Sequence, residues 1–126
     1  MIRFASLLVS GWALALPALA CEAVNLDNAV CQRVVVLGAG DQAVCHWKFD
    51  FRAKAAEDRF VHVGQVLQGC FGNALPPQVG VNHPDSYTQK IFETGDGKVS
   101  VALKDKGGLA ESYVFLRGPV SVVRPE

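Results

Sequence analysis

Residues 43–51 alternate between apolar and polar side chains, and this is the clearest pattern in the chain. Side chains of a β-strand point to opposite faces in turn, so a period of two predicts a half-buried strand. His46 lies on the polar face, where we expect it at the surface. The apolar face carries Cys45, Trp47, Phe49 and Phe51.

After residue 51 the apolar residues recur at steps of four and three. This spacing places them on one face of a helix, and it predicts an amphipathic helix over residues 52–70. Gly72 and the two prolines at 76 and 77 end it and begin a long loop over residues 73–86. Gly64 lies inside the helix, where it could mark close packing against a neighbour. The apolar face consists of Ala56, Phe60, Val63, Leu67 and Cys70.

Residues 27–37 carry two conflicting signals. Capping side chains at 25–28, followed by apolar residues at helical spacing, predict a helix over 27–37. The three consecutive valines at 34–36 favour a strand, which would pair with the strand that follows.

The second half of the chain predicts three strands, over residues 87–94, 98–104 and 109–117. Glycine-rich turns at 95–97 and 105–108 separate them, so we expect a meander of hairpins. The tail after residue 117 is expected to be an exposed strand or coil. Helices followed by linked strands favour an α+β fold: an antiparallel sheet of about four strands, with one or two helices packed on one face.

The first 20 residues have the layout of a cleaved secretory signal peptide. A positive start at Arg3 precedes an apolar run over 4–16, and small residues at 18 and 20 suit cleavage before Cys21. We therefore expect a periplasmic or secreted protein without an integral membrane segment after cleavage. Removal of the signal leaves 126 − 20 = 106 residues, enough for one small domain over residues 21–126.

The chain has four cysteines, an even number that is typical of disulfides in a small exported domain. A strand ending near residue 51 and a helix packing back across it would bring Cys70 beside Cys45. We therefore expect a Cys45–Cys70 bond, which leaves Cys21 to pair with Cys31. If residues 27–37 are helical, Cys31 would compete for Cys70.

Cys21 also raises the alternative of a lipid anchor. Lipoprotein signals usually place leucine three residues before the cysteine and a small residue two before it. Here Ala18 and Leu19 occupy those places in the reverse order. The order disfavours lipidation.

The charge balance restricts the partners. Without Arg3 the mature chain has 11 basic and 12 acidic side chains, so it lacks the strong positive field that holds a protein on nucleic acid. No phosphate-binding glycine loop, hydrolase elbow or helical histidine pair occurs, and we expect no cofactor and no metal.

The segment from Asn82 to Tyr87 is the densest in chemical groups. It also contains His83 and Asp85, of which the carboxylate could orient the imidazole for acid–base work. The same residue types build turns, and this alternative stays open. Lys104 and Lys106, expected at a hairpin tip, could receive an acidic partner.

These observations favour an exported protein that binds another protein, as envelope inhibitors and immunity proteins of this size do. Two alternatives remain: a small enzyme using His83 and Asp85, and an accessory protein that binds a small molecule or a metal through histidines. The absence of a catalytic signature makes an enzyme the weaker hypothesis.

Overall fold

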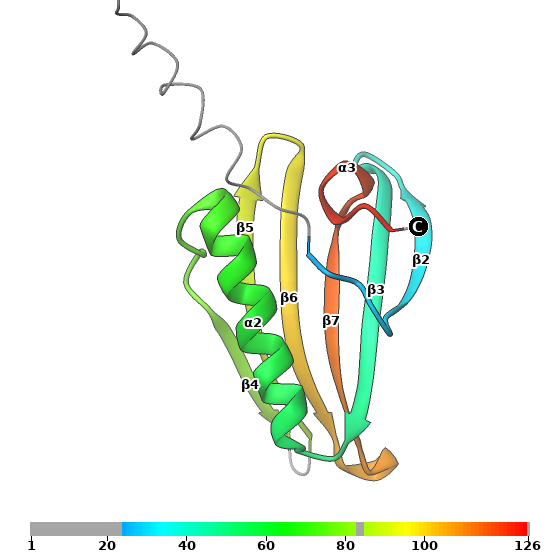
Figure 1. The fold of residues 1–126 in the computed structure, drawn as a ribbon, viewed down its shortest axis with the longest axis vertical. Coiled ribbons are helices and arrows are strands. Elements are labelled where there is room, and N and C mark those ends of the chain that lie inside the picture. Colours follow the sequence, from blue (N-terminus) through cyan, green and yellow to red (C-terminus); the bar gives the residue numbers. More distant parts are fainter. Residues whose placement is uncertain (1–23, 83–84, 126) are drawn as a thin grey trace, which may run out of the picture.

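A computed structural model describes residues 24–82 and 85–125 of the chain. These residues form a six-stranded sheet in the order β2-β3-β7-β6-β5-β4, in which every neighbouring pair of strands is antiparallel. Helix α2, Lys54–Phe71, lies across one face of this sheet (Figure 1). The strands are β2 Val30–Val36, β3 Gly40–Asp50, β4 Gln78–Asn82, β5 Asp85–Thr94, β6 Gly97–Lys106 and β7 Glu111–Pro119.

Residues 27–37 form a strand and not a helix, so the helical prediction is wrong. Strand β2 occupies Val30–Val36 and pairs with β3 across a tight turn, which is the alternative that the valine run favoured. Gly38 and Gly40 adopt φ of 85° and 74° in this turn, a region that residues with a Cβ rarely enter. β-Branched side chains and a glycine turn together outweigh the capping residues upstream.

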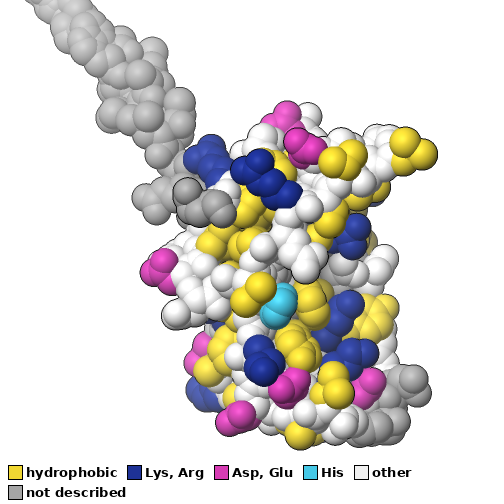
Figure 2. Space-filling view, turned by 90° about the vertical axis from the view of Figure 1, so that its right-hand side faces the viewer, with side chains coloured by type: hydrophobic (Ala, Val, Ile, Leu, Met, Phe, Trp, Pro, Cys, Tyr) yellow, Lys and Arg dark blue, Asp and Glu magenta, His cyan; other side chains and the backbone are white. Residues whose placement is uncertain are grey.

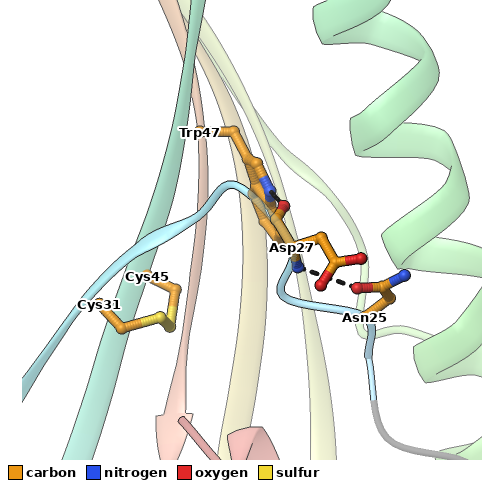
Figure 3. The surroundings of a disulfide bond; sticks show 5 residues. All are labelled: Asn25, Asp27, Cys31, Cys45 and Trp47. Atoms are coloured by element: carbon orange, nitrogen blue, oxygen red, sulfur yellow. Dashed lines mark hydrogen bonds between the residues drawn. A yellow bond between two sulfur atoms is a disulfide. The ribbon is translucent and has the colours of Figure 1, made fainter. Parts of the chain in front are cut away.

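The β2–β3 hairpin also corrects the disulfide pairing. Cys31 lies directly opposite Cys45, with their Cα atoms 4.0 Å apart, and the two form a disulfide (Figure 3). The expected Cys45–Cys70 and Cys21–Cys31 bonds are therefore both wrong, because the pairing of β2 with β3 brings Cys31, and not Cys70, beside Cys45. Cys70 is disulfide-bonded as well, while Cys21 lies outside the described residues. Disulfides are compatible with an oxidising compartment.

The segment before β2 is tied to the core through Trp47. The indole Nε1 donates a hydrogen bond to the carbonyl oxygen of Asp27 at 2.8 Å, and the Asp27 amide donates to Asn25 Oδ1 at 2.9 Å (Figure 3). A buried indole N–H needs a partner, and here a backbone carbonyl 20 residues away provides it.

The strand and the helix predicted over residues 43–70 are confirmed. β3 begins three residues earlier than expected and buries Ala43, Cys45 and Trp47. The helix buries Ala56, Phe60, Val63, Gly64 and Leu67, nearly the face that the spacing predicted. Its apolar face packs on the sheet and forms one core with buried residues of the strands, among them Phe92, Val99, Val101, Val114 and Leu116.

The expected long loop over residues 73–86 is wrong in its second half. Gln78–Asn82 form β4, which pairs with the start of β5 at Asp85. This strand and β2 raise the sheet from the expected four strands to six. The pattern was missed because β4 is short, contains Gly80 and follows two prolines.

The meander of β5, β6 and β7 is confirmed, with one shift. β6 continues to Lys106, and a 3-10 turn, η2 Gly107–Leu109, connects it to β7. Leu109 is therefore exposed in a turn and does not begin a strand. At the end of the chain, the single-turn helix α3, Val120–Val123, adds buried Val123 to the core.

No described helix combines the length and apolar character that crossing a membrane requires. The signal peptide predicted over residues 1–20 lies outside the described residues.

Candidate functional site

One face of the sheet carries helix α2 and the core, and the opposite face carries Asp85, Tyr87, Lys104 and Lys106, four of the residues predicted to bind a partner. We call it the open face. Along each strand its side chains alternate with those that point to the core, as the burial of β3 and β7 shows. Its central residues are His46, Lys48, Tyr87, Lys104, Tyr113 and Phe115.

The strand register arranges aromatic and basic residues of the open face in one row. Residues directly opposite one another in neighbouring strands lie closest on the shared face. The row therefore crosses five strands and alternates tyrosine with lysine after a first glycine. From β4 to β3 it reads Gly80, Tyr87, Lys104, Tyr113 and Lys48.

Beside this row the aromatic rings pack together. The His46 ring lies 5.9 Å from Tyr113 and 5.7 Å from Phe115, and Tyr113 stacks on Phe115 with centroids 5.7 Å apart. The Lys104 ammonium lies 5.1 Å from the Phe115 centroid, within the range of a cation–π contact. His46 is on the polar face as predicted, but it is half-buried in this cluster.

Two carboxylates of the open face are already paired. Glu111 lies 3.3 Å from Lys48 Nζ and accepts a hydrogen bond from the Tyr113 hydroxyl. That hydrogen bond, with help from Lys48, lowers the pKa of Glu111 below its ordinary value. The same bond to Glu111 raises the pKa of Tyr113, because the hydroxyl would have to give up its proton beside a carboxylate.

The second paired carboxylate is Asp85. Its Oδ1 accepts a hydrogen bond from the Gly107 amide at 2.9 Å, and its Oδ2 lies 3.6 Å from Lys106 Nζ. Asp85 therefore ties the start of β5 to the η2 turn. The Lys106 contact joins β5 to β6 and the Gly107 hydrogen bond reaches η2, so neither is a contact within the segment from Asn82 to Tyr87.

Lys104 differs from the other lysines in this region. Lys48 and Lys106 each lie within 4 Å of a carboxylate, whereas no carboxylate of residues 24–82 or 85–125 lies that close to Lys104. Its ammonium lies over the Phe115 ring instead. Lys104 thus carries a positive charge at the centre of the row that no carboxylate of the described residues neutralises.

A pocket of about 320 Å³ lies at the β4–β5–β6 end of the open face. Its shape depends on Gly80, because a Cβ at this position would lie 2.3 Å from Cε1 of Tyr87. The absent side chain lets the tyrosine ring lie over β4. The lining residues are Gly80, Val81, Asp85, Ser86, Tyr87, Lys104, Asp105 and Lys106.

Asp105 lies between the two lysines in sequence but points to the other face. Its carboxylate accepts hydrogen bonds from Ser86 Oγ at 3.0 Å and Ser112 Oγ at 2.5 Å, and it lies 3.7 Å from Arg52 Nε. Ser112 also accepts a hydrogen bond from the Arg52 amide at 2.8 Å. Residues 104–106 are therefore the end of a strand held to the β3–α2 connection, and the expected hairpin tip is wrong.

The structure brings together four residues that the sequence analysis named from two separate segments: Asp85, Tyr87, Lys104 and Lys106 all line the pocket. Asn82 ends β4 opposite Asp85, and His83 lies outside the described residues. The sequence analysis missed Tyr113 and Phe115. Their signal was the alternation in β7, where they share a face with Glu111 and Arg117 while Val114 and Leu116 point inward.

On the side shown in Figure 2, lysine and arginine side chains are interspersed with hydrophobic ones around a histidine. Within the described ranges, no group of three or more histidine, cysteine or acidic side chains is placed to hold a metal ion. His62 is exposed on helix α2, on the opposite side of the sheet from His46.

Comparison of the chain with protein-family models, curated proteins and solved structures found no match, so the site rests on its own geometry.

Proposed function

We propose that this protein is exported and acts by binding another protein through the open face of its sheet. The observation that carries the proposal is the cross-strand row of Tyr87, Lys104, Tyr113 and Lys48, which adjoins the aromatic cluster and the pocket. Protein interfaces typically have aromatic residues at their centre, where they act as binding hot spots, and polar groups at their rim.

The charge pattern favours a protein over a nucleic acid. Two of the three lysines in this region are paired with carboxylates of the same face, so the positive charge is local. Nucleic acid needs many unpaired basic groups, because each phosphate contact contributes through counterion release. A partner surface with a few acidic side chains suits the open face better.

The alternation of burial along the strands supports a rigid platform. The inner side chains of β3 and β7 are buried under α2, so the aromatic rings of the open face stand on strands that cannot shift freely. Preorganised side chains lose little conformational entropy when a partner binds. The Cys31–Cys45 bond constrains the hairpin that carries His46 and Lys48.

Capture from the native envelope fraction tests the proposal. The mature chain would be immobilised as the wild type, as a face variant with Tyr87→Ala and Lys104→Glu, and as a helix variant with Lys54→Glu. Lys54 has an 81% exposed side chain on α2 and makes only a surface ion pair with Asp58, so it provides a matched charge reversal away from the open face.

We expect one stoichiometric protein to be retained by the wild type and the helix variant and lost from the face variant. Thermal melts of all three would show that folding is intact. Retention by the face variant, or loss from the helix variant alone, would contradict the proposal.

A further inference from the structure

The pocket at the β4–β5–β6 end contains two hydrogen-bond donors that the described part of the chain does not use. The Lys104 ammonium has no carboxylate within 4 Å there, and the Tyr87 hydroxyl makes no hydrogen bond to a described residue. The two residues are direct cross-strand neighbours, so their side chains lie on the same side of the sheet. Both side chains therefore line one pocket, with the Lys104 ammonium over Phe115 of β7 and the Tyr87 ring over Gly80 of β4.

The carboxylates around the pocket are already satisfied. Asp85 is held by the Gly107 amide and by Lys106, and Asp105 is held by two hydroxyls and by Arg52 on the other face. If these pairs are counted as neutral, the charge of Lys104 remains, and the net charge of the pocket lining is +1. An incoming anion would thus meet one unpaired cation, with Lys106 beside it.

We infer that this pocket holds the carboxylate of an acidic side chain on the partner protein. A carboxylate carries a single negative charge, which matches the single unpaired cation, and its oxygens accept hydrogen bonds from ammonium and hydroxyl donors alike. The volume of about 320 Å³ is ample for the end of an aspartate or glutamate side chain. The inference rests on the proposed function, because it names the chemistry by which the open face recognises its partner.

Neighbouring contacts orient the two donors. Phe115 lies under the Lys104 ammonium at 5.1 Å, which favours a defined position of the long side chain. The missing side chain at Gly80 lets the Tyr87 ring lie over β4. Glycine at 80 is thus explained by the pocket, since its backbone φ is not in the left-handed region.

Titration of the isotope-labelled mature chain with a hexaglutamate peptide tests the inference by NMR. We expect saturable chemical-shift changes at residues 85–87 and 104–106, and we expect added salt to lower the affinity for the peptide. Hexaserine should produce none. Lys104→Gln keeps a polar side chain, one atom shorter than lysine, and removes its charge, so it should weaken binding of the peptide about tenfold, as loss of a charge-assisted hydrogen bond does.

Two further variants sharpen the test. Tyr87→Phe removes only the hydroxyl and should lower the affinity for the peptide by a smaller factor than Lys104→Gln does. Lys98→Gln is the matched control, because Lys98 is an exposed lysine that faces Glu93 at the far end of the same strand pair. It should bind like the wild type.

Peptide shifts elsewhere on the protein, or equal affinity of the Lys104→Gln and Lys98→Gln variants, would overturn the inference. Its failure is distinguishable from failure of the proposed function. If the partner is still captured through the open face, the proposed function holds and only the proposed recognition of a carboxylate fails. A partner that the face variant still retains would contradict the proposed function itself.

Discussion

Gly64 and Gly118 are both buried, yet the space around them differs. A Cβ on Gly64 in helix α2 would lie 3.8 Å from Lys90, an ordinary contact. A Cβ on Gly118 in β7 would lie 2.8 Å from Cγ2 and 3.2 Å from Cα of buried Val99. The suggestion that Gly64 marks close packing is therefore wrong, and Gly118 is the glycine that close packing requires.

The two glycines make a paired prediction. Gly64→Ala should stabilise the protein by about 1 kcal/mol, because alanine is the better helix former and has room. Gly118→Ala should destabilise it by about 1–3 kcal/mol through overpacking. Urea unfolding of both variants measures the difference, and a Gly118→Ala variant as stable as the wild type would show that β7 and Val99 separate easily.

The Glu111 carboxylate makes a prediction about pH at the same scale. Tyr113→Phe removes the hydrogen bond that contributes most to the lowered pKa of Glu111, so the pKa should rise toward its ordinary value. Lys48→Ala should raise it less. Carboxyl ¹³C titration by NMR measures both, and a larger effect of Lys48→Ala would contradict the order of causes.

The sign of the effect on stability follows from the direction of that shift. A carboxyl whose pKa is lower in the folded state stabilises the fold above its ordinary pKa. That contribution is lost as the pH falls through the folded value. The Glu111 contact should therefore matter at neutral pH and disappear in acid.

At the scale of elements, the sequence predicted those whose hydrophobic period is long and clean. The alternation over residues 43–51 and the helical spacing from Ala56 to Leu67 both hold, because burial on one side leaves a regular trace. β2 and β4 are edge strands of the sheet, exposed along one side, and their sequence patterns are weak. The capping signal at 25–28 favoured a local helix, whereas pairing with β3 decided the strand.

The candidate site was predictable in part for a related reason. Asp85, Tyr87, Lys104 and Lys106 stood out by residue type, but only the register of β5 with β6 shows that they line one pocket. Tyr113 and Phe115 were not predicted, because the strand expected over residues 109–117 was not assigned a buried and an exposed face. Their position depends on which face of β7 the helix covers, and this is a tertiary property.

The hairpin of β2 and β3 carries the prediction for this scale. Replacing Cys31 and Cys45 together by serine should lower stability by about 3 kcal/mol, the loss expected for a cross-link that closes a loop of 14 residues. Urea unfolding of the double variant measures it. Peptide mapping without reduction should recover Cys31 with Cys45, and recovery of Cys45 with Cys70 would show that the hairpin pairs differently.

At the scale of the whole molecule, export makes a separate prediction. Intact-mass analysis of protein from the native host should find a mature chain that begins at Cys21 and carries no lipid. Ala18 and Ala20 suit cleavage by the ordinary signal peptidase, and Ala18 and Leu19 stand in the reverse of the order that lipoprotein signals use. An added diacylglyceryl group on Cys21 would contradict this.

The central claim is that a protein partner covers the open face, and lysine footprinting of the isolated complex tests it most directly. Lysines would be acetylated in the free protein and in the complex with the captured partner, and the extent of modification would be read by mass spectrometry. Lys48, Lys104 and Lys106 report on the open face, and Lys54 on helix α2 is the internal control. We expect the three lysines to be protected while Lys54 reacts as before. Protection of Lys54 with Lys104 still reactive would show that the partner binds elsewhere.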